Sequence, residues 1–144
     1  MILLFCLVSG SSAFLASGVD ATRLTSAWQD IRFPTVWLNT GGDYRTTGVF
    51  TCRVPGLYWF TATLTKDWNV DVDSIECSIQ VNGRLKIRLY GNPVDDKDGY
   101  QVTGSLALQL TRGDRVQVGG YVNSDKISNS IRTYFSGMLV RPDV

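Results

Sequence analysis

A short segment near the middle of the chain, Gly83 to Leu89, combines cations with alternating apolar residues. Its sequence is GRLKIRL, so in an extended strand Arg84, Lys86 and Arg88 would project from one face, about 6.6 Å apart. Such a row of cations suits a polyanionic or glycan ligand, for example a sulfated or sialylated glycan or lipid A. The alternative is a solvent-exposed face, or an edge strand whose charges discourage aggregation.

Two acidic stretches flank this segment in the sequence. Aspartate oxygens in a loop are suitable ligands for calcium, although the first stretch lacks the glycine and the terminal glutamate of an EF-hand loop. The alternative is that these aspartates are solvated turn residues that pair with the basic segment. The candidate calcium ligands are Asp67, Asp71, Asp73, Asp95, Asp96 and Asp98.

The tripeptide Arg112-Gly113-Asp114 has the sequence of an adhesion motif and lies where a turn is expected. Its functional interpretation is integrin binding. The alternative, which we favour, is that Gly113 and Asp114 belong to an ordinary connection between two strands and that the arginine is incidental.

The composition excludes several classes of enzyme. The chain contains no histidine, so a nucleophile with an imidazole base and a histidine-ligated metal are both excluded. A glycosidase with two loop aspartates remains as an alternative, but we expect no enzymatic activity. The net charge is +1 and the cations are scattered, so no nucleic-acid partner is expected.

The N-terminal sequence, MILLFCLVSGSSA, starts with an apolar run that small residues follow. This pattern predicts a short or truncated secretory signal over residues 1–10, then one domain over residues 11–144, and a secreted, extracellular protein. Cleavage after Gly10 or after Ala13 fits the pattern, and the alternative is an apolar first strand. No other stretch approaches the ~18 apolar residues of a membrane span.

Three cysteines are present, and loss of Cys6 with a signal segment would leave the pair Cys52 and Cys77. A disulfide between them would stabilise the fold by about 3 kcal/mol in the chain-entropy model. The alternative is two buried free thiols in a reducing compartment.

Alternation with a period of two residues dominates the chain, and helical periodicity is nearly absent. Asn82-Gly83 is a strong signal for a two-residue hairpin, and Pro55-Gly56 separates two apolar runs. Turn signals recur about every ten residues, which is typical of a β-sandwich or jelly roll. We expect the tryptophans Trp28, Trp37 and Trp68 to pack, with stacking on a sugar ring as the alternative.

A series of short motifs then runs through the chain in order, and it resembles the globular domain of the complement C1q family over about residues 13–140. The residues that carry the resemblance are Ala13, Phe14, Phe33, Asn39, Gly42, Tyr44, Thr47, Gly48, Phe50, Pro55, Gly56, Tyr58, Phe60, Asn82, Gly83, Leu108, Leu110, Gly113, Asp114, Val116, Phe135, Ser136 and Gly137.

The resemblance implies an all-β, ten-stranded jelly roll of two sheets that is secreted and assembles as a homotrimer. It implies recognition of microbial surfaces, carbohydrates or proteins, often with calcium, and a bridge between cysteines such as Cys52 and Cys77 in some complement chains. The sequence has no collagen-like repeat, so a head-only member is expected. The expected function is lectin-like pattern recognition in innate immunity, and the alternative is a trimeric signalling or structural ligand for a host receptor.

Overall fold

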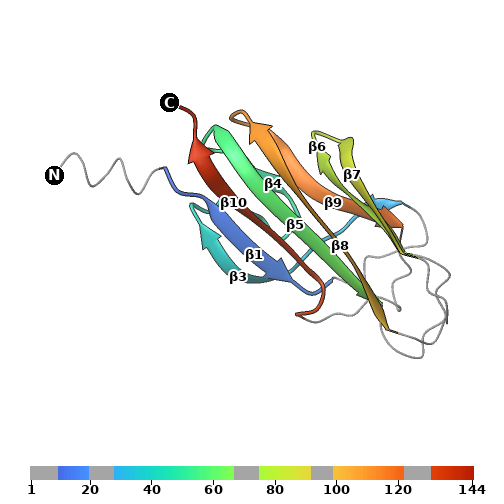
Figure 1. The fold of residues 1–144 in the computed structure, drawn as a ribbon. Coiled ribbons are helices and arrows are strands. Elements are labelled where there is room, and N and C mark those ends of the chain that lie inside the picture. The colour runs from blue at the N-terminus through green and yellow to red at the C-terminus, as the bar shows by residue number, and fades with distance from the viewer. Residues whose placement is uncertain (1–9, 20–27, 67–74, 92–98, 122–130) are drawn as a thin grey trace.

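The computed structural model describes residues 10–19, 28–66, 75–91, 99–121 and 131–144, which form ten strands and no helix (Figure 1). The strands are β1 (Ala13–Ser17), β2 (Gln29–Asp30), β3 (Thr35–Thr40), β4 (Phe50–Thr51), β5 (Gly56–Lys66), β6 (Ile75–Val81), β7 (Arg84–Gly91), β8 (Tyr100–Leu110), β9 (Arg115–Tyr121) and β10 (Tyr134–Pro142). The first halves of β5 and β10 alternate buried and less buried residues, as the period-two pattern predicted, whereas β3 is exposed throughout and β6 is mostly buried.

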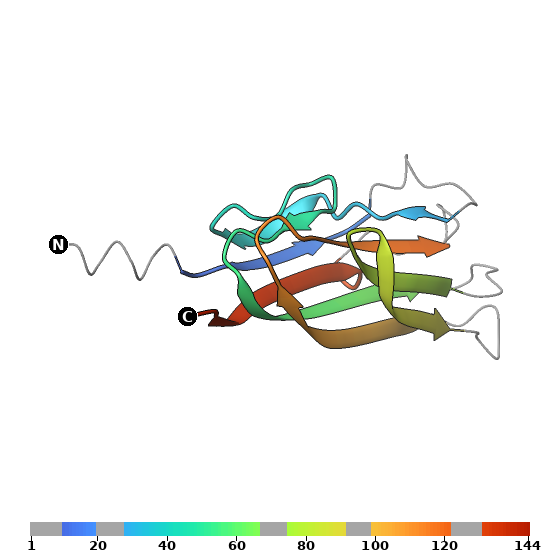
Figure 2. The ribbon, with the colours of Figure 1, turned by 90° about the horizontal axis from the view of Figure 1, so that it is seen from above.

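Two antiparallel sheets make up the fold, and the strands of both run along the length of the molecule (Figure 2). The first sheet has the strand order β3-β1-β10-β5-β8, and the second has the order β2-β9-β6-β7, with β4 also paired to β9. Neighbours in a sheet are often far apart in the sequence, because β1 pairs with β10 and β5 pairs with β8. The predicted ten-stranded jelly roll is therefore confirmed.

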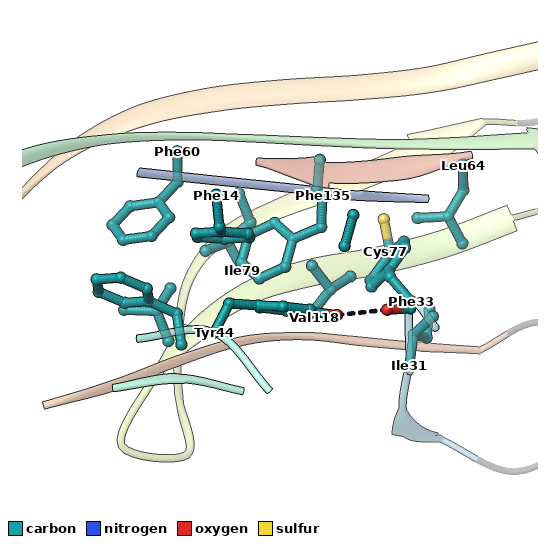
Figure 3. Packing of buried hydrophobic residues seen from close by; sticks show 14 of the residues in the cluster. Phe14, Ile31, Phe33, Tyr44, Phe60, Leu64, Cys77, Ile79, Val118 and Phe135 are labelled. Atoms are coloured by element: carbon teal, nitrogen blue, oxygen red, sulfur yellow. Dashed lines mark hydrogen bonds between the residues drawn. The ribbon is translucent and has the colours of Figure 1, made fainter. Parts of the chain in front are cut away.

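Aromatic rings fill much of the core between the sheets (Figure 3). The ring of Phe14 stacks on that of Tyr44 with centroids 4.7 Å apart, and it meets the ring of Phe135 edge-on at 4.9 Å. The Tyr44 hydroxyl donates a hydrogen bond of 2.8 Å to the carbonyl oxygen of Phe33, which satisfies the one polar atom of that buried ring. Buried rings of this size contribute a large part of the hydrophobic stabilisation.

Gly137 explains why the motif near the C-terminus needs a residue without a side chain. A Cβ atom there would come within 2.6 Å of the rings of Phe14 and Phe60. Such approaches are shorter than any packing contact, so a larger residue would push these rings apart. The glycine thus allows β10 to cross the aromatic core at close range.

The loop between β3 and β4 is fixed by two further motif residues. The Asn39 side chain accepts a hydrogen bond from the Tyr44 amide (3.1 Å) and donates one to the Tyr44 carbonyl (2.9 Å), which closes the turn between them. Gly48 has a φ of 93° and lies so close to Ile31 that a Cβ would be 2.3 Å from its carbonyl oxygen. Both residues therefore have local roles that the sequence motif could not reveal.

The β6–β7 hairpin has the predicted two-residue turn. Asn82 and Gly83 both have positive φ values, 52° and 78°, as a type I′ turn requires. Just beyond the turn the register shifts by one residue, because Gln80 pairs with Leu85 whereas Ile79 pairs with Ile87. Lys86 is therefore the extra residue of a β-bulge.

The start of the domain is held by a small polar network. The buried Asp43 carboxylate accepts hydrogen bonds from the Ser12 hydroxyl (2.7 Å) and from Arg53 Nε (2.9 Å). The Ser12 carbonyl also accepts a bond from the Leu139 amide of β10. These contacts attach the residues before β1 to the sandwich, and of the predicted signal segment, residues 1–10, only Gly10 lies within the described residues.

Candidate ligand-binding surfaces

The basic segment forms β7, which is the edge strand of the second sheet. Its three cations Arg84, Lys86 and Arg88 are exposed. They do not share one face, because Arg84 lies opposite the core residue Val81 whereas Arg88 lies opposite Ser78 on the outer side. The prediction of a single row of cations is therefore wrong, since a one-residue bulge at Lys86 reverses the alternation on one side of it.

We call the side of the second sheet that points away from the core the second outer face. On it, Arg88 forms an ion pair of 3.0 Å with Glu76, and its guanidinium lies 6.0 Å from the centroid of the Trp28 ring. The bulge also turns Leu85 onto this face, where it is 45% exposed. Besides Arg88 and Leu85, alternation and register place these residues here: Trp28, Asp30, Glu76, Ser78, Gln80, Tyr90, Arg115, Gln117 and Gly119.

Gly119 lies under the centre of the second outer face and shapes it. A Cβ at this position would meet the Gln80 amide nitrogen at 2.0 Å and the Trp28 indole nitrogen at 3.2 Å. Both side chains therefore lie close against the sheet above Gly119. Gln80 is fixed further because its amide donates to the Ser78 hydroxyl (3.2 Å).

A shallow polar hollow of about 280 Å³ opens beside these residues. The Gln117 amide donates a hydrogen bond of 2.9 Å to the Asp30 carboxylate at its rim. Arg115 and the β6–β7 turn form the rest of its lining. The hollow therefore brings an aspartate, an arginine and a glutamine together within one small area.

The side of the first sheet that points away from the core, the first outer face, has a different chemistry. Its register gives three rows of paired residues across four strands, and none of the twelve residues is ionisable except the weakly acidic Tyr134. The rows are Ala13, Met138, Trp59 and Ala107; Leu15, Ser136, Thr61 and Ser105; and Ser17, Tyr134, Thr63 and Thr103.

Large apolar side chains on the first outer face are open to solvent in the single chain. Trp59 is 45% exposed and Trp37 is 61% exposed. An apolar cavity of about 480 Å³ lies at one end of this face, lined by Leu15, Ser17, Trp37, Ile131 and Tyr134. Trp28 and Trp37 were expected to pack, but both keep a large exposed fraction, and Trp68 lies outside the described residues.

The six candidate calcium ligands, Asp67, Asp71, Asp73, Asp95, Asp96 and Asp98, lie outside the described residues. The residues that flank the two acidic stretches are described, and they lie at one end of the sandwich. Lys66 pairs with Tyr100, and Ile75 pairs with Gly91. Within the described part of the chain, no group of three acidic, cysteine or histidine residues is placed to hold a metal.

The predicted disulfide between Cys52 and Cys77 is not formed in the structure, which leaves both as buried free thiols. The Cys52 amide bonds to Asp114, just before β9, whereas Cys77 pairs with Gly120 near the other end of β9. Six residues of strand separate these points, about 20 Å, and a bridge requires Cα atoms within about 7 Å. Burial raises the pKa of the Cys77 thiol to about 12, and burial also raises the pKa of Cys52.

The carboxylate of the Arg112-Gly113-Asp114 tripeptide has a structural role. Asp114 accepts hydrogen bonds from the Thr111 amide (2.9 Å) and from the Asn82 side chain (2.9 Å). These bonds lower the pKa of Asp114, and the bond from the Thr111 amide has the largest effect. The side chain thus closes the β8–β9 turn and joins it to the β6–β7 turn, as the structural alternative predicted.

The fold and these surfaces define an all-β sandwich of the jelly-roll class, and comparison with known proteins identifies its family. The C1q domain model matches residues 13–140, so the chain belongs to the C1q domain family. The chain is 31% identical over 119 residues to one of the subunits of the complement C1q subcomponent from Rattus norvegicus. That alignment covers 78% of this chain but only 44% of the relative, so the chain spans less than half the length of that protein.

Solved structures show the same fold at lower sequence identity. The globular domain of the zebrafish complement 1qA protein superimposes with a TM-score of 0.68 at 18% identity, covering 92% of this chain and 99% of that one. Murine APRIL at pH 5.0 also gives a TM-score of 0.68, at 14% identity, covering 89% of this chain and 97% of that one.

Within the described residues, no helix is long and apolar enough to cross a membrane.

Sequence reasoning missed the residues that give the second outer face its character. Glu76 was not considered, because nothing in a single sequence pairs it with Arg88. Trp28 was expected to pack, because most tryptophans do. A usable signal was the glycine pair Gly119-Gly120 inside a strand, since glycine in a strand often marks a close approach by another group.

Proposed function

We propose that this C1q-domain protein is a secreted recognition protein that acts as a homotrimer and binds glycan or polyanionic ligands on microbial surfaces. Its role would be lectin-like pattern recognition in innate immunity, without catalysis. The observation that carries the proposal is the difference in surface chemistry between the two outer faces. The first outer face has three rows without an acidic or basic residue and leaves Trp59 and Met138 exposed, which suits contact with other copies of the chain, whereas the second presents charged, amide and aromatic groups to solvent.

The first outer face supports assembly because it exposes large apolar side chains to water in the single chain. Trp59 and Met138 are paired across β5 and β10 and are both about half exposed in the single chain. Burial of apolar surface stabilises an interface by about 25 cal/mol per Å². The three rows contain no charged side chain whose desolvation would oppose that burial. A second and a third copy of the chain, related by a three-fold axis, are the proposed occupants.

The β7 edge supports polyanion binding because assembly through the first sheet leaves it free. β7 belongs to the second sheet, and its Arg84 and Lys86 lie exposed beside the β6–β7 turn. Arg88 contributes less positive charge, since Glu76 pairs with it. A trimer would carry three such edges, and multivalent contact with a repetitive surface then raises the overall affinity without any new contact.

Calcium is also part of the proposal, at the end of the sandwich where the two acidic stretches begin and end. Its support is the number of aspartates in the two stretches and the adjacency of the strand ends that flank them, Lys66 beside Tyr100 and Ile75 beside Gly91. Oxygen-rich loops are the usual setting for this ion.

Two measurements on the full chain test the proposal. Light scattering should give three copies of the 15.9 kDa chain, about 48 kDa, in calcium, and removal of calcium with a chelator should loosen the trimer or weaken its binding. Heparin should bind in a salt-dependent way, and the double variant Arg84→Glu/Lys86→Glu should lose that binding. A monomer that binds neither heparin nor glycans, but that one host receptor captures, would instead support the alternative of a signalling ligand.

A further inference from the structure

We infer that the second outer face is a binding surface for neutral hexose polysaccharides, which adjoins the exposed cations Arg84 and Lys86 at the β6–β7 turn but does not include them. The inference deepens the proposed function, on which it rests for the view that the domain recognises glycans. It concerns the part of this face around Trp28, Gly119, Gln80 and the hollow at Asp30.

Trp28 supplies the apolar element that a sugar ring requires. Trp28 is 40% exposed even with the Arg88 guanidinium over its ring, 6.0 Å from the centroid, and Gly119 allows it to lie close against the sheet. A hexose has an apolar side formed by C–H groups, and an indole surface fixed in place can cover this side without losing much side-chain entropy. Tyr90 on β7 is also largely exposed on the same face and extends the aromatic surface across the sheet.

The hydrogen-bonding groups around Trp28 suit a polyol. The Asp30 carboxylate is held by the Gln117 amide, and an ionised carboxylate has lone pairs for several further donors. Arg115 also lines this hollow, and a guanidinium can donate to hydroxyl oxygens. Because a sugar hydroxyl both donates and accepts, an aspartate and an arginine that line one hollow can bind different hydroxyl groups of the same sugar.

The charge of this face favours a neutral ligand over an anionic one. Its paired positions carry two cations, Arg88 and Arg115, and two anions, Asp30 and Glu76. Arg88 is already paired with Glu76, and an anionic sugar would meet the Asp30 carboxylate at the hollow. A polyanion would therefore gain little here, whereas a neutral chain crossing the sheet could extend over about 14 Å, the span of four strands.

Titration calorimetry of the full chain with short single-chain sugars tests the inference. The probes are hexasaccharides of mannose, α-linked glucose and β-linked glucose, with a heparin hexasaccharide as the anionic counterpart. At least one neutral probe should bind, and Trp28→Ala should weaken it tenfold or more, whereas Trp28→Tyr should keep most of the affinity. Trp37→Ala, the same change on the first outer face, should leave the affinity for these monovalent probes unchanged.

Nuclear magnetic resonance gives a readout that needs no variant. The indole N–H signal of Trp28 should shift during titration with the neutral probe, which decides the question even if Trp28→Ala fails to fold. Binding of heparin without any neutral probe would overturn this inference and leave the proposed function standing. Neutral binding that neither shifts this signal nor depends on Trp28 would also overturn it, and failure of all probes would remove both proposals.

Discussion

The two outer faces of the sandwich are built by the same alternation but differ in what they offer to solvent. On the first, the rows across β1, β10, β5 and β8 carry apolar and hydroxyl side chains, and neighbouring hydroxyls bond to each other, such as Thr61 with Ser105 at 2.7 Å. On the second, ionised and amide groups surround Trp28. The first face thus leaves apolar side chains such as Trp59 exposed, whereas the second carries ionised groups at its surface. Assembly and recognition can thus occupy opposite sides of one small domain.

The largest effect should come from a charge on the first outer face. Trp59→Asp should convert the proposed trimer to a monomer, because a carboxylate would have to be desolvated among uncharged rows. Leu85→Asp is a matched control, since Leu85 is equally exposed, at 45%, but lies on the second outer face. Sedimentation of both variants checks the difference, and a Trp59→Asp protein that stays trimeric would show that copies do not meet through this face.

A smaller effect, on the free energy of unfolding, should distinguish two glycines. Gly137 faces the core behind the first outer face, and Gly119 lies on the second outer face. Gly137→Ala should lower the free energy of unfolding by about 1–3 kcal/mol, because the new methyl group would overlap two core rings. Gly119→Ala meets the terminal amide of Gln80, which can rotate away if it gives up its bond to Ser78, so the substitution should cost about 1 kcal/mol while displacing Gln80 and Trp28. Urea unfolding of the two variants measures both values, and equal losses would contradict the distinction.

The smallest effect concerns the turns at the edge of the second sheet. Because folding lowers the pKa of Asp114, its contribution to stability is present above the ordinary aspartate pKa, near 4, and is lost as the pH falls through the lowered value. Asp114→Ala should therefore be slightly less stable than the parent at pH 7, and the difference should vanish in strong acid. Thermal unfolding at several pH values gives the comparison; a difference that grows on acidification would contradict it.

The course of the strands could be predicted from the sequence more fully than the chemistry of their faces. Period-two alternation and the Asn82-Gly83 turn depend on neighbouring residues, so they were sufficient to predict an all-β sandwich and the hairpin, whereas the number of strands came from the family resemblance. The bulge at Lys86 depends on how β7 pairs with β6, and it separated Arg84 from Arg88. The predicted disulfide failed for the same reason, because the distance between two cysteines is set by the register of a third strand, β9.

The positions of the two ends of the domain have a practical consequence for how it can be displayed. Ser12 bonds to β10 next to its C-terminal end, and Asp143 bonds to Pro55 nearby, so both ends leave the sandwich on the same side (Figure 1). A tether at either end would therefore hold the molecule in the same orientation on a sensor or a bead. In a cyclic trimer with its axis along the strands, all six ends would point one way. The strand ends at Lys66, Ile75, Gly91 and Tyr100 would then face outward, away from the support.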